Sequence, residues 1–292
     1  MADSIHQAGT ETDQAIVKNI IFNGRLVSRN QPLFSSGNRS FRYGDGLFES
    51  MRYAKGQIYW LDRHIRRLQE GMHFLGLESP EILSADYLAA QIAKLELSGP
   101  SRLRLSVFRS GGGTYQPQTD SFEYLIEADS LPTPWYSTNA KGLVCGIFRA
   151  LKLSGNLLEN IKSSNRLTQV LASRYAGKNQ LDDMLIQHQS GTLAEGTASN
   201  LFLFRGKQLI TPALNSGCLA GVMRSLVMEI GEELGYEIVE AAILPQRLAE
   251  FDFAWLTNSI QGIRWIERIE GIDLQEGPTR DFIQKLNQKV LK

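Results

Sequence analysis

NIKSSNRLTQVLASRYAGKNQLDDMLIQHQSGTLAEGTASN, Asn160–Asn200, is the stretch that decides the fold. Lys162 follows a loop and precedes a run with helical character, Asn165–Ala176. A strand-like run follows at Met184–His188, and a glycine-containing turn then leads to Glu195 and a new apolar strand. A helix and two strands therefore join the lysine to the glutamate, and this path can bring both side chains to one cleft.

These two side chains suit one kind of chemistry in particular. A lysine amine forms imines with carbonyl compounds, and a pyridoxal cofactor needs a partner such as a carboxylate at its ring nitrogen. Taken alone, however, a lysine before a helix is typical of a solvated surface, and a glutamate in a turn is equally ordinary. The pair alone leaves both interpretations open.

Length and composition limit the possible functions. The chain has 292 residues, which indicates about two domains. Its 31 basic and 31 acidic residues give no net charge, so neither nucleic acid nor a membrane is expected as a partner. No apolar run approaches the roughly 18 residues of a membrane span. Cys145 and Cys218 lie far apart, which favours reduced thiols in a cytoplasmic protein.

The polar N-terminus does not resemble a signal peptide, and we expect residues 1–15 to form a disordered tail. An N-terminal α/β domain is predicted over residues 16–131. Two prolines, Pro132 and Pro134, interrupt any helix or strand ladder and predict a linker over residues 132–140. Residues 141–292 would then form a second domain.

Apolar periodicity predicts mixed α/β and α+β structure rather than a purely doubly wound sheet. A hairpin is expected at Asn23-Gly24, and Ser84 is expected to cap a helix. Arg102 and Arg104 interrupt a predicted strand with charge. The expected strands are 15–22, 25–28, 47–53, 57–60, 103–108, 122–128, 142–148, 184–188, 201–204, 236–242 and 253–256. The expected helices are 61–76, 84–95, 166–176, 222–234, 245–250 and 281–290.

The motifs K-S-S-N-R-L at Lys162 and E-G-T-A-S-N-L-F at Glu195 resemble those of the class IV (fold type IV) pyridoxal-phosphate enzymes. The resemblance covers roughly Asn23 to Ile269. It implies that Lys162 carries the cofactor as a Schiff base and that Glu195 faces the pyridine nitrogen. It also implies a small N-terminal α/β domain, a larger barrel-like C-terminal domain with the cofactor between them, and a homodimer in which the partner supplies some site groups.

The cofactor's phosphate needs local positive charge or free amides, since the chain has no net charge. The resemblance assigns this role to Arg67 in H-I-R-R-L, to the amides of Val222 and Met223 in G-V-M-R, and to Ser259 in T-N-S. Asn200 in S-N-L-F is placed in the cofactor site as well. From the residues alone, Arg67 also suits a solvated helix face and the other two segments suit ordinary turns.

Within this family, several details resemble the aminodeoxychorismate lyases. These are N-R-L-T-Q-V-L after the lysine, Y-G-D-G-L-F-E, G-V-M-R, and T-N-S-I-Q-G-I. D-amino acid aminotransferases share G-D-G and S-N, and branched-chain aminotransferases remain a further alternative. The substrate expected in each case is a small-molecule amine, and we predict no metal site.

One departure concerns the substrate's carboxylate. Family members often place a second arginine five residues after the one equivalent to Arg109, whereas this chain has Thr114 there. Arg39, or Arg42 beside Tyr43, could substitute for the missing arginine, although both also suit a surface. Tyr43, Arg109, Thr114 and Asn258 are further candidates for contacting substrate.

Two classes of protein other than an enzyme compete with this interpretation. A non-catalytic relative of the family would lack the lysine, yet Lys162 and Glu195 are both present. The loop Ser110–Thr114, S-G-G-G-T, suggests a nucleotide-binding module, but it lacks the lysine of a P-loop and opens no predicted helix. Both alternatives are therefore weaker than a pyridoxal-phosphate enzyme.

Overall fold

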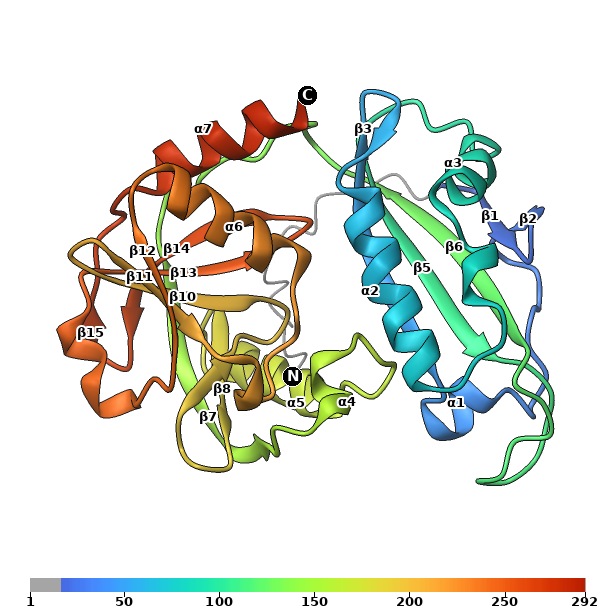
Figure 1. The fold of residues 1–292 in the computed structure, drawn as a ribbon, viewed down its shortest axis with the longest axis horizontal. Helices are drawn as coiled ribbons and strands as arrows, with labels where there is room; N and C mark the ends of the chain where they lie inside the picture. Colours follow the sequence, from blue (N-terminus) through green and yellow to red (C-terminus); the bar gives the residue numbers. More distant parts are fainter. Residues whose placement is uncertain (1–16, 292) are drawn as a thin grey trace, which may run out of the picture.

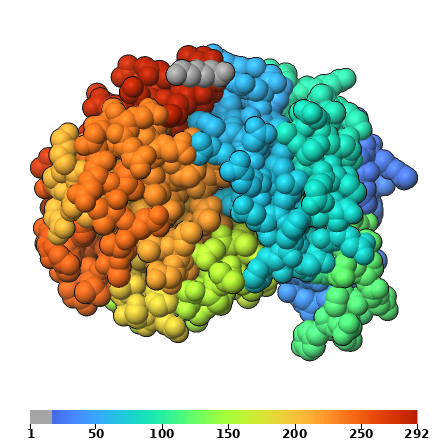
Figure 2. Space-filling view, viewed as in Figure 1, coloured from blue at the N-terminus to red at the C-terminus, as the bar shows by residue number. Residues whose placement is uncertain are grey.

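The computed structural model describes residues 17–291. Two units lie side by side, each built on its own sheet (Figure 1). Their surfaces meet along a broad boundary, with the N-terminal unit coloured from blue to green and the C-terminal unit from yellow-green to red (Figure 2). No helix within the described residues is long and apolar enough to cross a membrane. The predicted tail, residues 1–15, lies outside the described residues.

The N-terminal unit is a six-stranded antiparallel sheet in the order β2-β1-β6-β5-β3-β4. The predicted hairpin is confirmed, because Asn23 and Gly24 both have positive φ, 47° and 78°, as a tight two-residue turn requires. The strands are β1 (Asn19–Phe22), β2 (Arg25–Ser28), β3 (Gly46–Ala54), β4 (Gln57–Ile58), β5 (Ser101–Arg109) and β6 (Phe122–Ser130).

Two helices bury one face of this sheet, α2 (Leu61–Phe74) and α3 (Ala85–Ala93). Alternate residues of β5, including Leu103 and Leu105, are fully buried in that core. Ser84 caps α3 as predicted, because its hydroxyl accepts a hydrogen bond from the amide of Tyr87. The opposite face of the sheet, which carries the intervening polar side chains, is turned toward the other unit.

The C-terminal unit is a closed barrel. Its sheet runs β10-β13-β14-β7-β8-β9, and a further pairing of β9 with β10 closes the ring. The ring strands are β7 (Leu143–Leu153), β8 (Asp183–His188), β9 (Leu193–Glu195), β10 (Asn200–Arg205), β13 (Phe253–Asn258) and β14 (Gly262–Ile269). Three strands extend or flank the ring, β11 (Gln208–Pro212), β12 (Glu237–Ala241) and β15 (Ile272–Asp273). The expected fold class, mixed α/β and α+β with a barrel-like C-terminal domain, is confirmed.

Helices pack on the outside of the barrel and seal it with aromatic side chains. Trp255 on β13 contacts Phe204 and Phe282, with ring centroids 4.4 and 4.8 Å apart. Phe282 belongs to the last helix, which therefore closes this side of the domain (Figure 1). The helices are α4 (Leu157–Asn160), α5 (Leu167–Lys178), α6 (Val222–Glu233) and α7 (Thr279–Val290).

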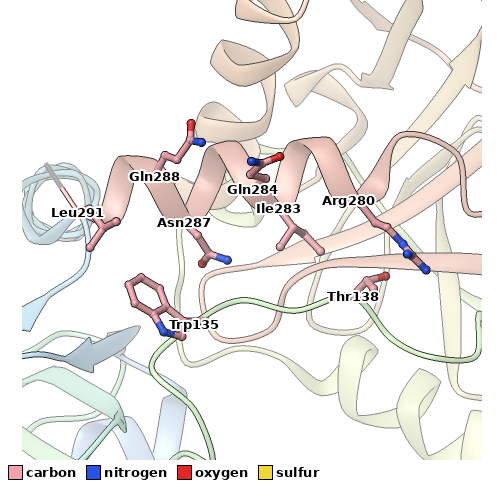
Figure 3. A pocket seen from close by; sticks show the side chains of 8 residues that line it. All are labelled: Trp135, Thr138, Arg280, Ile283, Gln284, Asn287, Gln288 and Leu291. Atoms are coloured by element: carbon pink, nitrogen blue, oxygen red, sulfur yellow. The ribbon is translucent and has the colours of Figure 1, made fainter.

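The connection between the two units contains neither helix nor strand from the end of β6 at Ser130 to the start of β7 at Leu143. It is held against α7, where Asn287 exchanges two hydrogen bonds with the main chain of Tyr136. A cavity of about 450 Å³ lies between this connection and α7, with Trp135 and Asn287 facing each other across it (Figure 3). The connection is thus fixed to the surface of the barrel.

Some elements differ from the predicted ones. The predicted loop after β2 contains a short helix, α1 (Arg39–Tyr43), which Asn38 caps and Gly44 ends with a φ of 67°. The strands β11 and β14 were not expected, because prolines and charged residues disturb their alternation. The predicted helix at Pro245–Glu250 is a 3₁₀ helix, η3. Shorter 3₁₀ helices occur at Pro80–Ile82 (η1) and Leu214–Ser216 (η2).

Candidate active site

A cavity of about 760 Å³ opens between the sheet and the barrel. The sheet contributes side chains from β3 and β5, and α2 adds Arg67. The barrel contributes the segments around Lys162, Glu195 and Asn200, the start of α6, and the carboxyl end of β13. The cavity therefore collects residues that lie far apart in the sequence and come from both units.

Lys162 is positioned by main-chain pairing with the other unit. Its carbonyl accepts a hydrogen bond of 2.9 Å from the amide of Phe48, and the Ser164 amide donates to the Gly46 carbonyl at 2.9 Å. These bonds place the lysine segment alongside β3, where Ser163 and Leu47 form an isolated antiparallel β-bridge. The Lys162 amine lies 4.5 Å from the centroid of the Phe48 ring, inside the cavity.

The environment lowers the pKa of Lys162 to about 7, from an ordinary 10.5. Burial is the main cause, and the positive charge of Arg67 adds to it, whereas Glu49 opposes it. Near neutral pH a substantial fraction of the amine is therefore unprotonated. An unprotonated amine is the form that acts as a nucleophile or a base.

Glu195 ends β9 and is buried, with 5% of its surface exposed. One carboxylate oxygen accepts from the Gln169 amide at 3.0 Å, and the other accepts from the Leu219 amide at 2.8 Å. Burial raises the pKa of Glu195, while Arg166 and these hydrogen bonds oppose the rise. A cationic group beside this carboxylate would favour its ionised form.

Arg67 projects from α2 into the same cavity and is fixed by a buried glutamate. Its guanidinium makes two hydrogen bonds to Glu49, of 2.8 and 2.5 Å, and a third of 3.0 Å to the Ala220 carbonyl. His64 contacts the same carboxylate at 2.7 Å. Burial would raise the pKa of Glu49, but Arg67 and His64 lower it to about 2. Glu49 therefore stays ionised and holds Arg67 in one orientation.

The start of α6 offers free main-chain amides to the cavity. Gly221 occupies the cap position without a side-chain cap, so the amides of Val222 and Met223 have no partner within the helix. A Cβ at Gly221 would lie 1.9 Å from the Asn200 side-chain oxygen, which explains why glycine is required there. Asn200 in turn donates to the Leu219 carbonyl at 2.8 Å and fixes this turn.

The carboxyl end of β13 completes this part of the cavity. The Thr257 hydroxyl is buried and has no hydrogen-bond partner among residues 17–291, although Thr257 lines the cavity. Ser259 and Asn258 line it as well, and Asn258 donates to the Ser199 hydroxyl at 3.1 Å. An unpartnered buried hydroxyl beside a helix N-terminus and an arginine suits a bound phosphate.

The predicted cofactor, pyridoxal phosphate, fits these residues. Lys162 supplies an amine with a lowered pKa, and Glu195 supplies a buried carboxylate. Arg67, the start of α6 and the end of β13 supply donors for a phosphate. Each residue predicted to contact the cofactor thus lines one cavity, although their individual roles remain predictions.

The other predicted substrate residues lie elsewhere in this chain. Arg39 pairs with Asp45 at 2.8 Å and donates to the Thr114 carbonyl at 2.6 Å. Arg109 pairs with Asp45 at 3.0 Å and with Asp120. These contacts stabilise the S-G-G-G-T loop, and Arg42 and Tyr43 on α1 are likewise outside the cavity lining. Their predicted contact with substrate stays a prediction that requires a second copy of the chain.

Four arginines that were not predicted as site residues line the cavity. They are Arg102, Arg104, Arg166 and Arg264. The sequence held a signal for the first two, because charges at alternate positions of an otherwise apolar strand indicate a polar face. The other two carry no such signal, since only the closing of the barrel brings them to the cavity.

Comparisons with known proteins identify the family. The family model described as Amino-transferase class IV matches residues 46–269. The chain is 30% identical to the aminodeoxychorismate lyase of Bacillus subtilis (strain 168), over 94% of each protein. It is 25% identical to the D-alanine aminotransferase of Bacillus licheniformis, over 88% of this chain and 90% of that one.

Solved structures give the same result for the fold. A putative 4-amino-4-deoxychorismate lyase from Legionella pneumophila superposes with a TM-score of 0.78 at 25% identity, over 89% of this chain and 97% of that one. The branched-chain amino acid aminotransferase of Thermobaculum terrenum, in its PLP-bound holo-form, superposes with a TM-score of 0.82 at 21% identity, over 95% of each. This chain belongs to the class IV aminotransferase family of pyridoxal-phosphate-dependent enzymes.

Proposed function

We propose that this protein is an aminodeoxychorismate lyase that converts 4-amino-4-deoxychorismate to 4-aminobenzoate and pyruvate, a step of folate biosynthesis, with pyridoxal phosphate as cofactor. The observation that carries the proposal is the Lys162 amine, with its lowered pKa, in a cavity that also holds the buried carboxylate of Glu195. The similarity to the Bacillus subtilis lyase over 94% of each chain supports this choice of substrate.

Pyridoxal phosphate, when bound, supplies a carbonyl that condenses with amines and a protonated ring that accepts an electron pair. Glu195 provides the negative charge that keeps such a ring protonated. Arg67 and the amides of Val222 and Met223 would hold the phosphate, which leaves the Lys162 amine free to act on the substrate.

Lys162 acts as the base. Its unprotonated amine removes the proton from the ring carbon that bears the substrate's nitrogen. The neighbouring carbon–oxygen bond then breaks, the ring becomes aromatic, and the enolpyruvyl group leaves with its electron pair. The leaving group takes up a proton and becomes pyruvate, and aromatisation makes this elimination strongly favourable.

The test supplies purified holoenzyme with 4-amino-4-deoxychorismate and measures pyruvate and 4-aminobenzoate. We expect both products in equal amounts, and none with Lys162→Ala. Borohydride reduction followed by peptide mass analysis should attach the cofactor to Lys162. Labelling of a different lysine would contradict its role as the residue that binds the cofactor.

An aminotransferase acting on D-amino acids or branched-chain L-amino acids is the second candidate. The 25% identity to a D-alanine aminotransferase favours it, as do the shared G-D-G and S-N motifs. It would use Lys162 and Glu195 in the same roles. Incubation with these amino acids plus 2-oxoglutarate distinguishes the two, since glutamate formation without any 4-aminobenzoate would favour the aminotransferase.

We further propose that the enzyme is a cytoplasmic homodimer whose two domains meet at the linker 132–140. An apolar stripe on α5 supports the dimer, because Leu167, Val170 and Tyr175 are 74%, 58% and 48% exposed at helical spacing. Val170 also lines the cavity, so a second copy on this stripe would reach its rim. Tyr115 at the tip of the S-G-G-G-T loop, 89% exposed, is available to such a partner.

A further inference from the structure

Two arginines on β5 line the cavity without any partner of opposite charge. Arg102 and Arg104 alternate with the buried Leu103 and Leu105, so both guanidinium groups project from the face of the sheet that borders the cavity. Within residues 17–291, neither side chain makes a hydrogen bond or an ion pair, and the Arg102 Nε is buried without a partner.

The surrounding groups offset the charge of this pair only in part. Glu127 and Asp129, which lie opposite the two arginines on β6, contact Arg29 at 3.5 and 2.9 Å. The neighbouring Arg52, directly opposite Arg102 on β3, donates instead to the carbonyls of Ile260, Thr133 and Trp135. The terminal guanidinium nitrogens of Arg52 thus donate to main-chain carbonyls, while its Nε has no partner; Arg102 and Arg104 make no such contacts within residues 17–291.

Burial and the charge of Arg102 lower the pKa of Arg104, and Glu127, the smallest of the three contributions, opposes them. Two like charges held together in a partly buried site destabilise each other unless an anion lies between them. Of the other ionisable groups lining the cavity, three are acidic and four are basic. The acidic groups are Glu195, Asp182 and Asp183, and the basic groups are Lys162, Arg67, Arg166 and Arg264. The three carboxylates are occupied, since each accepts a hydrogen bond from a main-chain amide.

The position of the pair relative to Lys162 follows from Phe48. The Arg104 guanidinium lies 4.0 Å from the centroid of the Phe48 ring, and the Lys162 amine lies 4.5 Å from the same centroid. Both cations therefore contact one ring. Ser50, which lies directly opposite Arg104 on β3, also lines the cavity.

We propose that Arg102 and Arg104 form a subsite for a substrate carboxylate that lies away from the reacting carbon. This inference rests on the proposed function. The substrate 4-amino-4-deoxychorismate has its ring carboxylate across the ring from the amine, so an amine held at Lys162 directs that carboxylate away from the reacting centre. A guanidinium fork matches a carboxylate in geometry and charge. Arg102 and Arg104 thereby take the place of the arginine that family members often have at the position of Thr114.

The experiment uses the holoenzyme and two matched probes, 4-aminobenzoate and aniline, which differ only in the carboxylate. Binding is followed by calorimetry. We expect Arg104→Gln and Arg102→Gln each to weaken binding of 4-aminobenzoate about tenfold to hundredfold. Aniline binding should be unchanged, and Arg104→Lys should retain part of the preference for 4-aminobenzoate over aniline. Arg25→Gln, which removes an exposed arginine from the same sheet, is the control.

Kinetics give a second readout. For 4-amino-4-deoxychorismate, KM should rise in both variants while kcat changes less, since the arginines do not contact the reacting carbon. Wild-type enzyme that binds the two probes equally well would overturn the subsite, even if it is an active lyase. A protein that prefers 4-aminobenzoate through these arginines, yet forms none from the substrate, would retain the subsite and refute the proposed function.

Discussion

Lys162 acquires its chemical character from its surroundings. The same side chain on a solvated helix would be protonated at neutral pH, with a pKa near 10.4. Here the amine lies on the Phe48 ring in a cavity that also contains the Arg67 guanidinium. Burial and this positive charge together lower its pKa to about 7. The unprotonated base is therefore available at neutral pH without a dedicated proton acceptor.

This lowered pKa makes the stability of the cofactor-free protein depend on pH. Between pH 7 and 10.5 Lys162 is neutral in the folded protein and protonated in the unfolded one. The unfolded state then binds more protons, so the free energy of unfolding rises with pH in this window, by about 1.4 kcal/mol per unit. Urea unfolding of wild type and Lys162→Met measures the effect.

The free energy of unfolding of Lys162→Met should exceed that of wild type most below pH 7, and this difference should decline as the pH rises toward 10. Because all other groups are shared, the difference between the two proteins isolates the lysine. A difference that stays constant across this range would show that Lys162 is exposed and has an ordinary pKa.

Glu195 is expected to act through its charge. In Glu195→Gln the side chain keeps its shape and can still accept from the Leu219 amide, but the negative charge is lost. We expect kcat to fall by two to three orders of magnitude, because removing a shielded charge pair costs on the order of a few kcal/mol. Cofactor content, measured by absorbance, should persist. A variant with wild-type kcat would remove Glu195 from the catalytic machinery.

At the scale of elements, the start of α6 combines a loop and a helix into one binding feature. Asn200 on β10 fills the space that a side chain at Gly221 would need, and it holds the turn through the Leu219 carbonyl. The first amides of α6 are left free as a result. Two separate segments of sequence, S-N-L-F and G-V-M-R, thus meet in a single turn.

Val222→Pro tests this feature without disrupting the helix. Proline is well tolerated at the first position of a helix, and Gly221 has an extended ψ of 136°, which suits a residue before proline. The substitution removes one amide donor, and we expect cofactor affinity to fall about tenfold to hundredfold. Equilibrium titration of the apoprotein measures it, with Val222→Ala as the control for lost packing. Equal affinity in both variants would exclude this amide as a phosphate ligand.

At the scale of the whole molecule, the position of α5 connects catalysis with assembly. One side of the helix contributes Gln169, which donates to Glu195, while Leu167 and Leu171 on the outer side are exposed. Exposed apolar stripes of this kind usually mark an interface. A dimer formed here would cover the rim of the cavity in each subunit.

Leu171→Glu is expected to convert the dimer into a monomer, since a charge buried in an apolar interface is unfavourable. Light scattering coupled to gel filtration measures the mass of the protein in solution. Leu26→Glu, which changes an exposed leucine on β2, should leave the mass unchanged. A wild-type protein that is monomeric at micromolar concentration would refute the proposed dimer.

The sequence determined the local elements wherever one signal dominated. Asn23-Gly24 predicted its hairpin and Ser84 its helix cap, because turn and cap geometry depend on a few neighbouring residues. The motifs around Lys162 and Glu195 predicted residues that share one cavity. The prediction missed other elements, such as α1 and β14, because local preferences there are weak and tertiary contacts decide.

Only the tertiary structure determined which charges meet. Arg102 and Arg104 interrupted the apolar pattern of a strand and so indicated a polar face, but the sequence did not show what that face meets. In the folded protein both border the cavity, whereas Arg39 and Arg109, which seemed suited to bind a substrate, pair with Asp45. Whether an arginine binds a ligand or a neighbouring carboxylate depends on long-range packing. Local sequence cannot encode that choice, because the competing partners come from distant strands.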